Sequence, residues 1–372
     1  MKSISLYRLN GLLLLGVLFV VVMYYGRVFF IPLAFSVVIS MLMLPVSRKL
    51  ERWGFNRFWA TIFCVLLLLL FAAGFILIIA AQAASFSEDL PQIQQRLHEI
   101  LNQVQGWIQQ EFGVEPHRQL SFVKTQIAKI GQSANQFFTS ILQGTVSIVT
   151  AFILVILYVF FLLWSREKYK TFILQLVSAN HQAEAKKTLE EITKVSGQYL
   201  IGRLISMLFV ATIYSIAFSI MGLKDALLIS VIAVLPNLIP YVGAFIGAFF
   251  PLIMTLVSGS PGMFVPTVAV LIMAQVLDNN IIEPLVMGKQ LSLSPIMTIF
   301  AIVIGELIWG IPGMILFEPL FAIIRIVSSH VSKLNPISYV MGDDHEATKA
   351  PGWLMKLKEK FSAAKASSNP DA

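Results

Sequence analysis

Charged residues are scarce in this sequence, and their scarcity excludes most soluble proteins. Asp, Glu, Lys and Arg make up 13% of the 372 residues, whereas hydrophobic residues make up 57%, and the mean hydropathy is +0.80. A globular protein needs about 25% charged residues to cover a surface that faces water. We therefore expect most of the surface to face lipid, in an all-α, polytopic transmembrane helical bundle.

Cysteine and the motifs of catalysis are nearly absent as well. Cys64 is the one cysteine, which excludes an intramolecular disulfide and a cysteine metal cluster. The pair Gly288-Lys289 lacks the other residues of a P-loop, and neither GxSxG nor HExxH occurs. The net charge of +7 is divided among many short segments rather than gathered in one stripe. We therefore predict no enzyme, no cofactor, no resident metal and no nucleic-acid partner.

Long hydrophobic runs recur along the whole chain. A bilayer core of about 30 Å is crossed by about 20 apolar residues in a helix, and a helix satisfies its own backbone hydrogen bonds there. Eight runs are candidate spans, each expected to cross once: 9–25, 28–46, 59–81, 145–164, 204–221, 226–257, 263–277 and 296–327.

The distribution of basic residues predicts the topology. With the N-terminus in the cytoplasm and alternating sides, 20 of the 27 Lys and Arg residues fall on the cytoplasmic side, and Arg203 is counted among them. Cytoplasmic loops are enriched in Lys and Arg. We therefore expect a multi-pass membrane protein with both termini in the cytoplasm.

The spans divide the chain into five segments. Residues 1–82 contain the first three spans. Apolar residues at helical spacing predict an extracytoplasmic helical hairpin over 83–144, and the sequence favours an ordinary solvated cap packed on the spans over a specific binding site. Residues 145–203 contain the fourth span and a charged cytoplasmic helix, and 204–330 contain spans broken by Pro and Gly. Residues 331–372 form a cytoplasmic, amphipathic and disordered tail.

The sixth run contains a predicted break. Pro236 and Pro240 lack the N–H that a helix needs, and a broken backbone at membrane depth requires protein or water to replace the lost hydrogen bonds. Asn237 is placed to supply one of them. The break is either a structural kink or part of a substrate pathway, and the sequence favours neither. Gly243 and Gly247 form a GxxxG pair, which favours close helix packing.

A dense group of amides and carboxylates follows the seventh run. Helical spacing places Gln275, Asp278 and Asn279 on one face, and a proline is expected to end the helix. Charged side chains are costly at the bilayer centre and face the protein interior or a pore. The alternative is an interfacial loop that begins at Asp278. The candidate pathway residues are Gln275, Asp278, Asn279, Asn280, Glu283 and Pro284.

The last run, 296–327, is longer than a perpendicular crossing requires and is interrupted by Gly and Pro, which predicts a bent or discontinuous helix. Glu306 and Glu318 lie within it. Either carboxylate is a candidate proton or ion site, and either could instead form a hydrogen bond to a neighbouring helix.

Three segments together resemble the autoinducer-2 exporter family of bacterial membrane proteins. They are PNLIPYVGAFIGAFFP, DNNIIEPLVMGKQLSLSP and GELIWGIPGMILFEPLFAIIRIV. The family's D-N-N-x-x-x-P stretch corresponds to Asp278, Asn279, Asn280 and Pro284, and its Pro-Tyr-Val-Gly stretch to residues 240–243. Glu318 is a departure, because the family usually has a small or apolar residue there.

This resemblance implies export of a small polar signalling molecule for some members, sodium/proton exchange for others, and homo-oligomers. We therefore expect a permease of the bacterial inner membrane that exports a small solute, such as an autoinducer-2-like molecule. One alternative is a monovalent cation/proton antiporter that uses the same carboxylates. A second alternative is a non-transporting membrane scaffold, whose activity would survive the change Asp278→Asn.

Overall fold

The computed structural model describes residues 6–74, 76, 77, 95, 99, 145–223, 225–258, 261–286 and 293–342. These residues are almost entirely helical, and the β-pairing recorded among them is one isolated bridge between Leu293 and Gly342. The predicted all-α, polytopic class is confirmed. The predicted hairpin over 83–144 lies outside the described residues apart from residues 95 and 99, and the tail lies outside them from residue 343 onward. The five-segment division stays a prediction.

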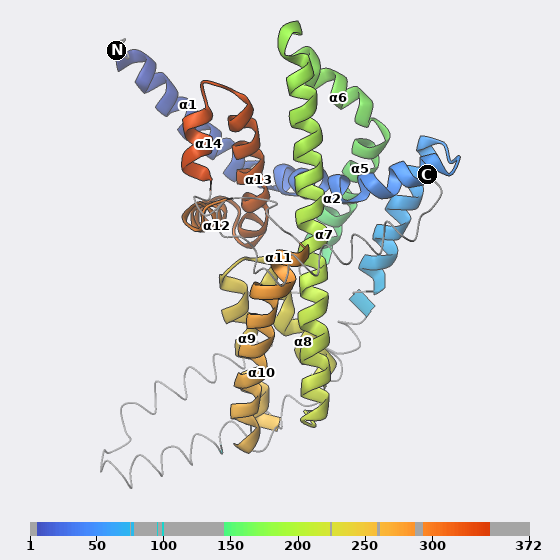
Figure 1. Ribbon diagram of the computed structural model, residues 1–372, viewed down its shortest axis with the longest axis vertical. Coiled ribbons are helices and arrows are strands. Elements are labelled where there is room, and N and C mark those ends of the chain that lie inside the picture. The colour runs from blue at the N-terminus through green and yellow to red at the C-terminus, as the bar shows by residue number, and fades with distance from the viewer. Residues whose placement is uncertain are drawn as a thin grey trace, which may run out of the picture.

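Apart from the gap between residues 74 and 145, most of the described helices follow one another with short connections (Figure 1). The longer ones are α1 (Leu6–Tyr25), α2 (Arg27–Arg52), an unlabelled helix over Arg57–Gly74, α5 (Thr145–Trp164), α6 (Arg166–Gln175), α7 (Gln182–Ile220), α8 (Ala226–Val234), α9 (Val242–Ser258), α10 (Phe264–Leu277), α12 (Pro295–Trp309), α13 (Ile311–His330) and α14 (Asn335–Met341). Three 3₁₀ turns cover Ala179–His181, Leu235–Leu238 and Pro261–Met263, and a π-helical turn over Asp278–Ile282 joins α10 to α11 (Glu283–Val286).

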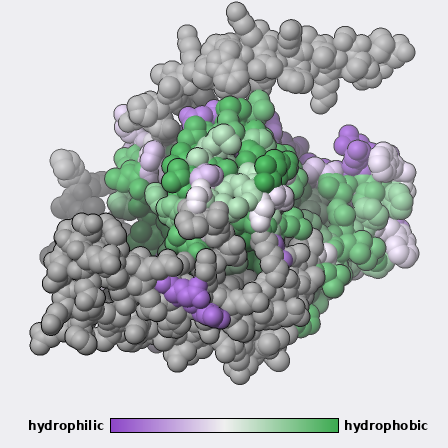
Figure 2. Space-filling model, turned by 90° about the horizontal axis from the view of Figure 1, so that it is seen from below, coloured by the Kyte–Doolittle hydropathy of each residue, from purple (hydrophilic) through white to green (hydrophobic). Residues whose placement is uncertain are grey.

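Five helices among the described residues are long and apolar enough to cross a membrane, or six if the bent pair α5 and α6 counts as one span. The pair is bent by 71°. The five cover Arg27–Arg52, Arg57–Gly74, Ala179–Ile220, Phe264–Val286 and Ile311–His330. Large apolar side chains such as Ile220 and Phe245 are more than 80% exposed, and the described residues that are visible from below are mostly hydrophobic (Figure 2). Such a surface suits contact with lipid.

Helix α7 is the central column of the molecule. Its 39 residues span about 58 Å at 1.5 Å per residue, roughly twice the thickness of a bilayer core. The predicted charged helix and the predicted fifth span are therefore one continuous helix, because no proline interrupts it. Helices α2, α6 and α13 pack on α7 toward its N-terminal half and middle, and α8 and α10 pack on its C-terminal half (Figure 1).

The sixth predicted span is a helical hairpin rather than one crossing, which corrects the sequence interpretation. Helices α8 and α9 pack side by side. A Cβ added at Gly243 would clash with the carbonyl oxygen of Pro236, and one added at Gly247 would clash with that of Ala233. Because residue numbers rise on one arm as they fall on the other, the arms are antiparallel. The segment with Pro236 and Pro240 reverses the chain instead of kinking it.

The eighth predicted span is also a hairpin, made of α12 and α13. Gly310 joins the two helices with φ of 65° and ψ of −142°, a conformation that glycine adopts without a Cβ clash. Gly305 and Gly313 face each other so closely that a Cβ on either would clash with the other's carbonyl oxygen. The turn is held against α1 by Trp309, whose Nε1 donates to the Met23 carbonyl oxygen at 2.9 Å.

Candidate functional site

Asp278 is a buried carboxylate in the interior of the bundle, and both of its oxygens lie within hydrogen-bond distance of one hydroxyl. Its side chain begins the π-helical turn after α10 and is 3% exposed. The Ser206 Oγ on α7 lies 2.7 Å from Asp278 Oδ1 and 2.8 Å from Oδ2. Because the hydroxyl has one proton, it serves the two oxygens alternately or as a shared donor. This pair ties the middle of α7 to the end of α10.

The π-helical turn over Asp278–Ile282 has a local cause. Pro284 has no N–H, so the carbonyl of Asn280, four residues earlier, cannot be satisfied in the usual α-helical way. The helix continues through the proline as α11, and single π-turns inside helices often occur at functional sites. The alternative of an interfacial loop that begins at Asp278 is therefore wrong.

Glu318 forms a second buried pair about two turns earlier along the same face of α7. This carboxylate lies within α13 and is 7% exposed, and its Oε2 accepts a hydrogen bond of 2.6 Å from the hydroxyl of Tyr199, which is 6% exposed. Pro319 follows it directly and is also fully buried. Glu318 therefore points into the bundle and not toward lipid.

Arg203 lies between the two pairs and provides the positive charge of the group. It interacts electrostatically with Asp278, Glu283 and Glu318, and its buried Nε has no hydrogen-bond partner among the described residues. Glu283 is half-buried, in the turn of helix that packs on α7. We call Tyr199, Arg203, Ser206, Asp278, Glu283 and Glu318 the polar cluster.

Sequence reasoning missed the three α7 members of the polar cluster. Tyr199, Arg203 and Ser206 are spaced by four and three residues, so they share one helix face. The same face continues as buried Val210 and Tyr214. The distribution of basic residues predicts a cytoplasmic position for Arg203, whereas the structure places it within the long helix, among carboxylates. The signal in the sequence was that three polar residues at helical spacing continue into apolar residues on the same face, which indicates that this polar face is buried.

Three of the predicted pathway amides do not join the polar cluster. The Gln275 Nε2 donates to the Asn279 Oδ1 at 2.9 Å, and the Asn280 Nδ2 donates to the carbonyl oxygen of Val276 at 2.8 Å. Asn279 and Asn280 are exposed on the isolated chain, whereas Asp278 is buried. Gln275, Asp278 and Asn279 therefore do not share one environment. Pro284 is exposed beside them.

The other predicted residues occupy two further places. Asn237 is 8% exposed at the turn of the α8–α9 hairpin, and its Oδ1 lacks a hydrogen-bond partner among the described residues. This turn, which contains Pro236, packs on α7, whereas Pro240 lies just beyond it, and Gly243 and Gly247 lie in the close helix contact. Glu306 is exposed on α12, outside the polar cluster.

The polar cluster gathers hydrogen-bond donors, acceptors and charges at the point where three helices meet. Placing one charge at the bilayer centre costs at least about 2.5 kcal/mol, so three carboxylates and an arginine within spanning helices form an expensive arrangement. Two hydroxyl donors and one guanidinium offset part of that cost. Residues of this kind inside membrane segments commonly mark substrate or ion pathways.

Comparisons with known proteins point in the same direction. The model of a family described as AI-2E family transporter matches residues 13–333. The chain is 26% identical over 321 residues to "Putative transport protein YueF" of Bacillus subtilis, covering 82% of this chain and 85% of the relative. It is 26% identical over 322 residues to "Putative transport protein YrrI" of the same organism, covering 83% and 88%. It is 25% identical over 325 residues to "Putative permease PerM" of Escherichia coli, covering 84% and 92%.

Proposed function

Because this chain belongs to the AI-2E family of transporters, we propose that it exports a small polar solute across the bacterial inner membrane, with the polar cluster on its pathway. The solute we propose is an autoinducer-2-like signalling molecule. The solute's own gradient or an ion gradient supplies the energy. We also propose that the working unit is a homo-oligomer with both termini in the cytoplasm.

The observation that supports this proposal most strongly is the meeting of two buried carboxylates on one face of α7. Asp278 comes from the π-turn and Glu318 from α13, and each receives a hydroxyl from α7. A structural bundle could fill these positions with apolar residues at lower cost. A pathway for a polar solute needs fixed donors and acceptors within the membrane, and the polar cluster supplies both.

A second candidate function is monovalent cation/proton antiport. The charge balance of the polar cluster favours it, because three carboxylates face a single guanidinium. Even after Arg203 neutralises one carboxylate, the remaining acidic groups can hold a monovalent cation or protons in turn. The same residues serve both hypotheses, so the transported species decides between them.

Purified protein in liposomes distinguishes these hypotheses. One set of vesicles is loaded with labelled autoinducer-2, and its release is followed. A second set contains a pH-sensitive dye and receives a sodium gradient without organic solute. Export predicts solute release without sodium-dependent proton movement, whereas antiport predicts the reverse.

Substitutions within the polar cluster test whether it lies on the pathway. We expect Asp278→Asn and Glu318→Gln each to slow transport by about tenfold or more, the equivalent of one lost charge-assisted hydrogen bond. Glu306→Gln removes an exposed carboxylate from a neighbouring apolar helix and is the matched control. Equal transport rates in the wild type and in all three variants would show that the polar cluster does not lie on the pathway. Loss of activity only when residues 85–142 are deleted would favour a scaffold.

A further inference from the structure

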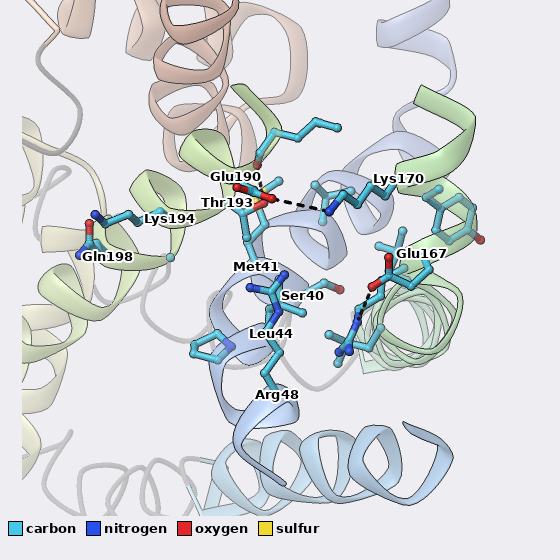
Figure 3. Close-up of a pocket in the computed structure, with 18 of the residues that line it drawn as sticks. Ser40, Met41, Leu44, Arg48, Glu167, Lys170, Glu190, Thr193, Lys194 and Gln198 are labelled. Carbon is cyan, nitrogen blue, oxygen red and sulfur yellow. Dashed lines mark hydrogen bonds and ion pairs between the residues drawn. The ribbon is translucent and has the colours of Figure 1, made fainter. Parts of the chain in front are cut away.

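A cavity of about 620 Å³ opens between α2, the bent pair α5 and α6, and the N-terminal half of α7. Leu44 and Arg48 line it from α2, Lys170 lines it from α6, and Glu190, Lys194 and Gln198 line it from α7 (Figure 3). We call this cavity the basic pocket. It is large enough for the headgroup phosphate of an amphiphile and the first part of its acyl chain.

The basic pocket carries a surplus of positive charge. Five basic side chains line it against two acidic ones. Arg166 pairs with Glu51 at 2.5 Å, and Lys170 pairs with Glu190 at 3.7 Å. In the part of the chain that the structure describes, no ion pair is recorded for Arg48 or Arg52, the other two arginines that line the pocket.

Arg48 and Arg52 are placed to bind one anion together. They are four residues apart on α2, so they share one helix face. Figure 3 shows the Arg48 side chain extending from α2 into the pocket. A guanidinium presents several N–H donors in a geometry that matches phosphate oxygens.

The inner wall of the basic pocket is apolar. Leu44, Leu162, Leu163 and Ile201 come from three different helices and line it together with Met41. A soluble anion such as phosphate gains nothing from such a wall, whereas an acyl chain buries apolar surface against it. The combination of paired arginines and an apolar wall fits an amphiphile that carries an anionic head.

The basic pocket is separate from the polar cluster. Its α7 residues, including Lys194, Gln198 and Ile201, and the polar-cluster residues of α7 lie on opposite faces, since successive residues are turned by about 100°. Tyr199 is buried, whereas Gln198 beside it is exposed. A ligand in the basic pocket therefore does not occupy the proposed transport path.

We propose that the basic pocket is a binding site for an anionic glycerophospholipid of the surrounding bilayer. Arg48 and Arg52 hold the headgroup phosphate, and one acyl chain lies along the apolar wall between α2 and α7. Basic pockets between membrane helices are a recurrent setting for anionic lipid headgroups. The bound lipid bridges α2 to α7 and to the α5–α6 bend, and this role goes beyond the proposed export.

Native mass spectrometry of the purified full chain tests the proposal. The protein is titrated with dioleoyl-phosphatidylglycerol and, separately, with dioleoyl-phosphatidylcholine. We expect the anionic lipid to bind more tightly to the wild type and the preference to fall by about tenfold or more in Arg48→Gln/Arg52→Gln. The matched control, Lys186→Gln/Lys187→Gln, removes two exposed charges from α7 outside the pocket and keeps the preference. An unchanged preference in the arginine variant overturns the proposal.

A second variant keeps the charges and fills the apolar wall. Leu44→Trp is expected to weaken phosphatidylglycerol binding. If this variant binds the lipid as tightly as the wild type does, the proposed position of the acyl chain is wrong. Inorganic phosphate is added as a competitor in parallel. Displacement of the lipid by equimolar phosphate would show that the pocket takes a free anion and would overturn the lipid proposal. All variants are first compared by size-exclusion chromatography, and the lipid measurement is independent of transport.

Discussion

Single residues in this protein are best understood from the cost of burying polar groups in a membrane helix. Ser206 and Ser230 are both buried serines, but they use their hydroxyls differently. Ser230 donates to the carbonyl oxygen of Ala226 in its own helix at 2.7 Å, whereas Ser206 donates to a carboxylate from another helix. The first contact is local, and the second holds two segments together.

We predict that Ser206→Ala lowers the free energy of unfolding by about 1–3 kcal/mol, because Asp278 remains buried without its hydroxyl donor. Ser230→Ala removes a hydroxyl of the same size and should cost much less. Thermal denaturation in detergent, followed by tryptophan fluorescence, compares the two variants. Equal melting temperatures would mean that the bond between α7 and the π-turn contributes nothing to stability.

Arg203 gives a second residue-level prediction. We expect Arg203→Met to cost about 3 kcal/mol or more, because it leaves three carboxylates near one another without a cation. Adding Glu283→Gln should recover part of that loss by removing one of the repelling charges. Folded yield and melting temperature measure the effect. A double variant less stable than Arg203→Met would show that the carboxylates do not repel one another.

The sequence predicted the acidic half of the polar cluster and not its partners. Asp278, Glu283 and Glu318 were recognisable because a carboxylate within an apolar run has few explanations. Hydroxyls such as Ser206 are common in membrane helices, and Arg203 fitted a topological explanation equally well. Only the packing of α10, α11 and α13 against α7 identifies the face that completes the group.

At the level of elements, glycine contacts determine how the hairpins close. Pro236 and Pro240 predicted a break correctly, but they could not predict its direction, since a kink and a reversal need the same missing N–H groups. The direction depends on the contacts of Gly243 and Gly247 with the preceding helix. The four-residue spacing predicted close packing without identifying the partner.

We predict that Gly247→Ala destabilises the protein by about 3 kcal/mol or more, because the new methyl group meets the Ala233 carbonyl oxygen, a backbone atom that cannot rotate away. Gly16→Ala is the matched control, since a Cβ there has no neighbour within 4 Å. Melting temperatures in detergent compare the two. A Gly247→Ala protein as stable as Gly16→Ala would contradict the close contact between α8 and α9.

At the scale of the whole molecule, the polar cluster lies where two groups of helices meet on α7. Tyr199, Arg203 and Ser206 lie close to the midpoint of this helix, which runs from Gln182 to Ile220. Glu318 reaches them from α13 and Asp278 from the end of α10, so the upper and lower groups in Figure 1 are joined there by polar contacts. A ligand bound at this place contacts both groups at once.

The two hairpins also change the path of the chain through the membrane. A single crossing over 226–257 would carry the chain to the opposite side, whereas the antiparallel α8–α9 hairpin returns it to the side from which it started. The start of α10 then lies on the same side as the end of α7. The α12–α13 hairpin likewise returns the chain to its own side, so the prediction that both termini lie on one side is the same for either path.

Cysteine labelling distinguishes the two paths. In a Cys64→Ala background, single cysteines are placed at Ser178 before α7, at Ile220 at the end of α7, and at Gly262 before α10, where a Cβ has no neighbour within 4 Å. Intact cells are treated with a membrane-impermeant thiol reagent. The hairpin predicts that Gly262→Cys reacts in the same way as Ile220→Cys, whichever side that is, and opposite to Ser178→Cys. If Gly262→Cys instead matches Ser178→Cys, the segment 226–257 crosses the membrane once, and the direction of α10, with Asp278 at its end, is reversed.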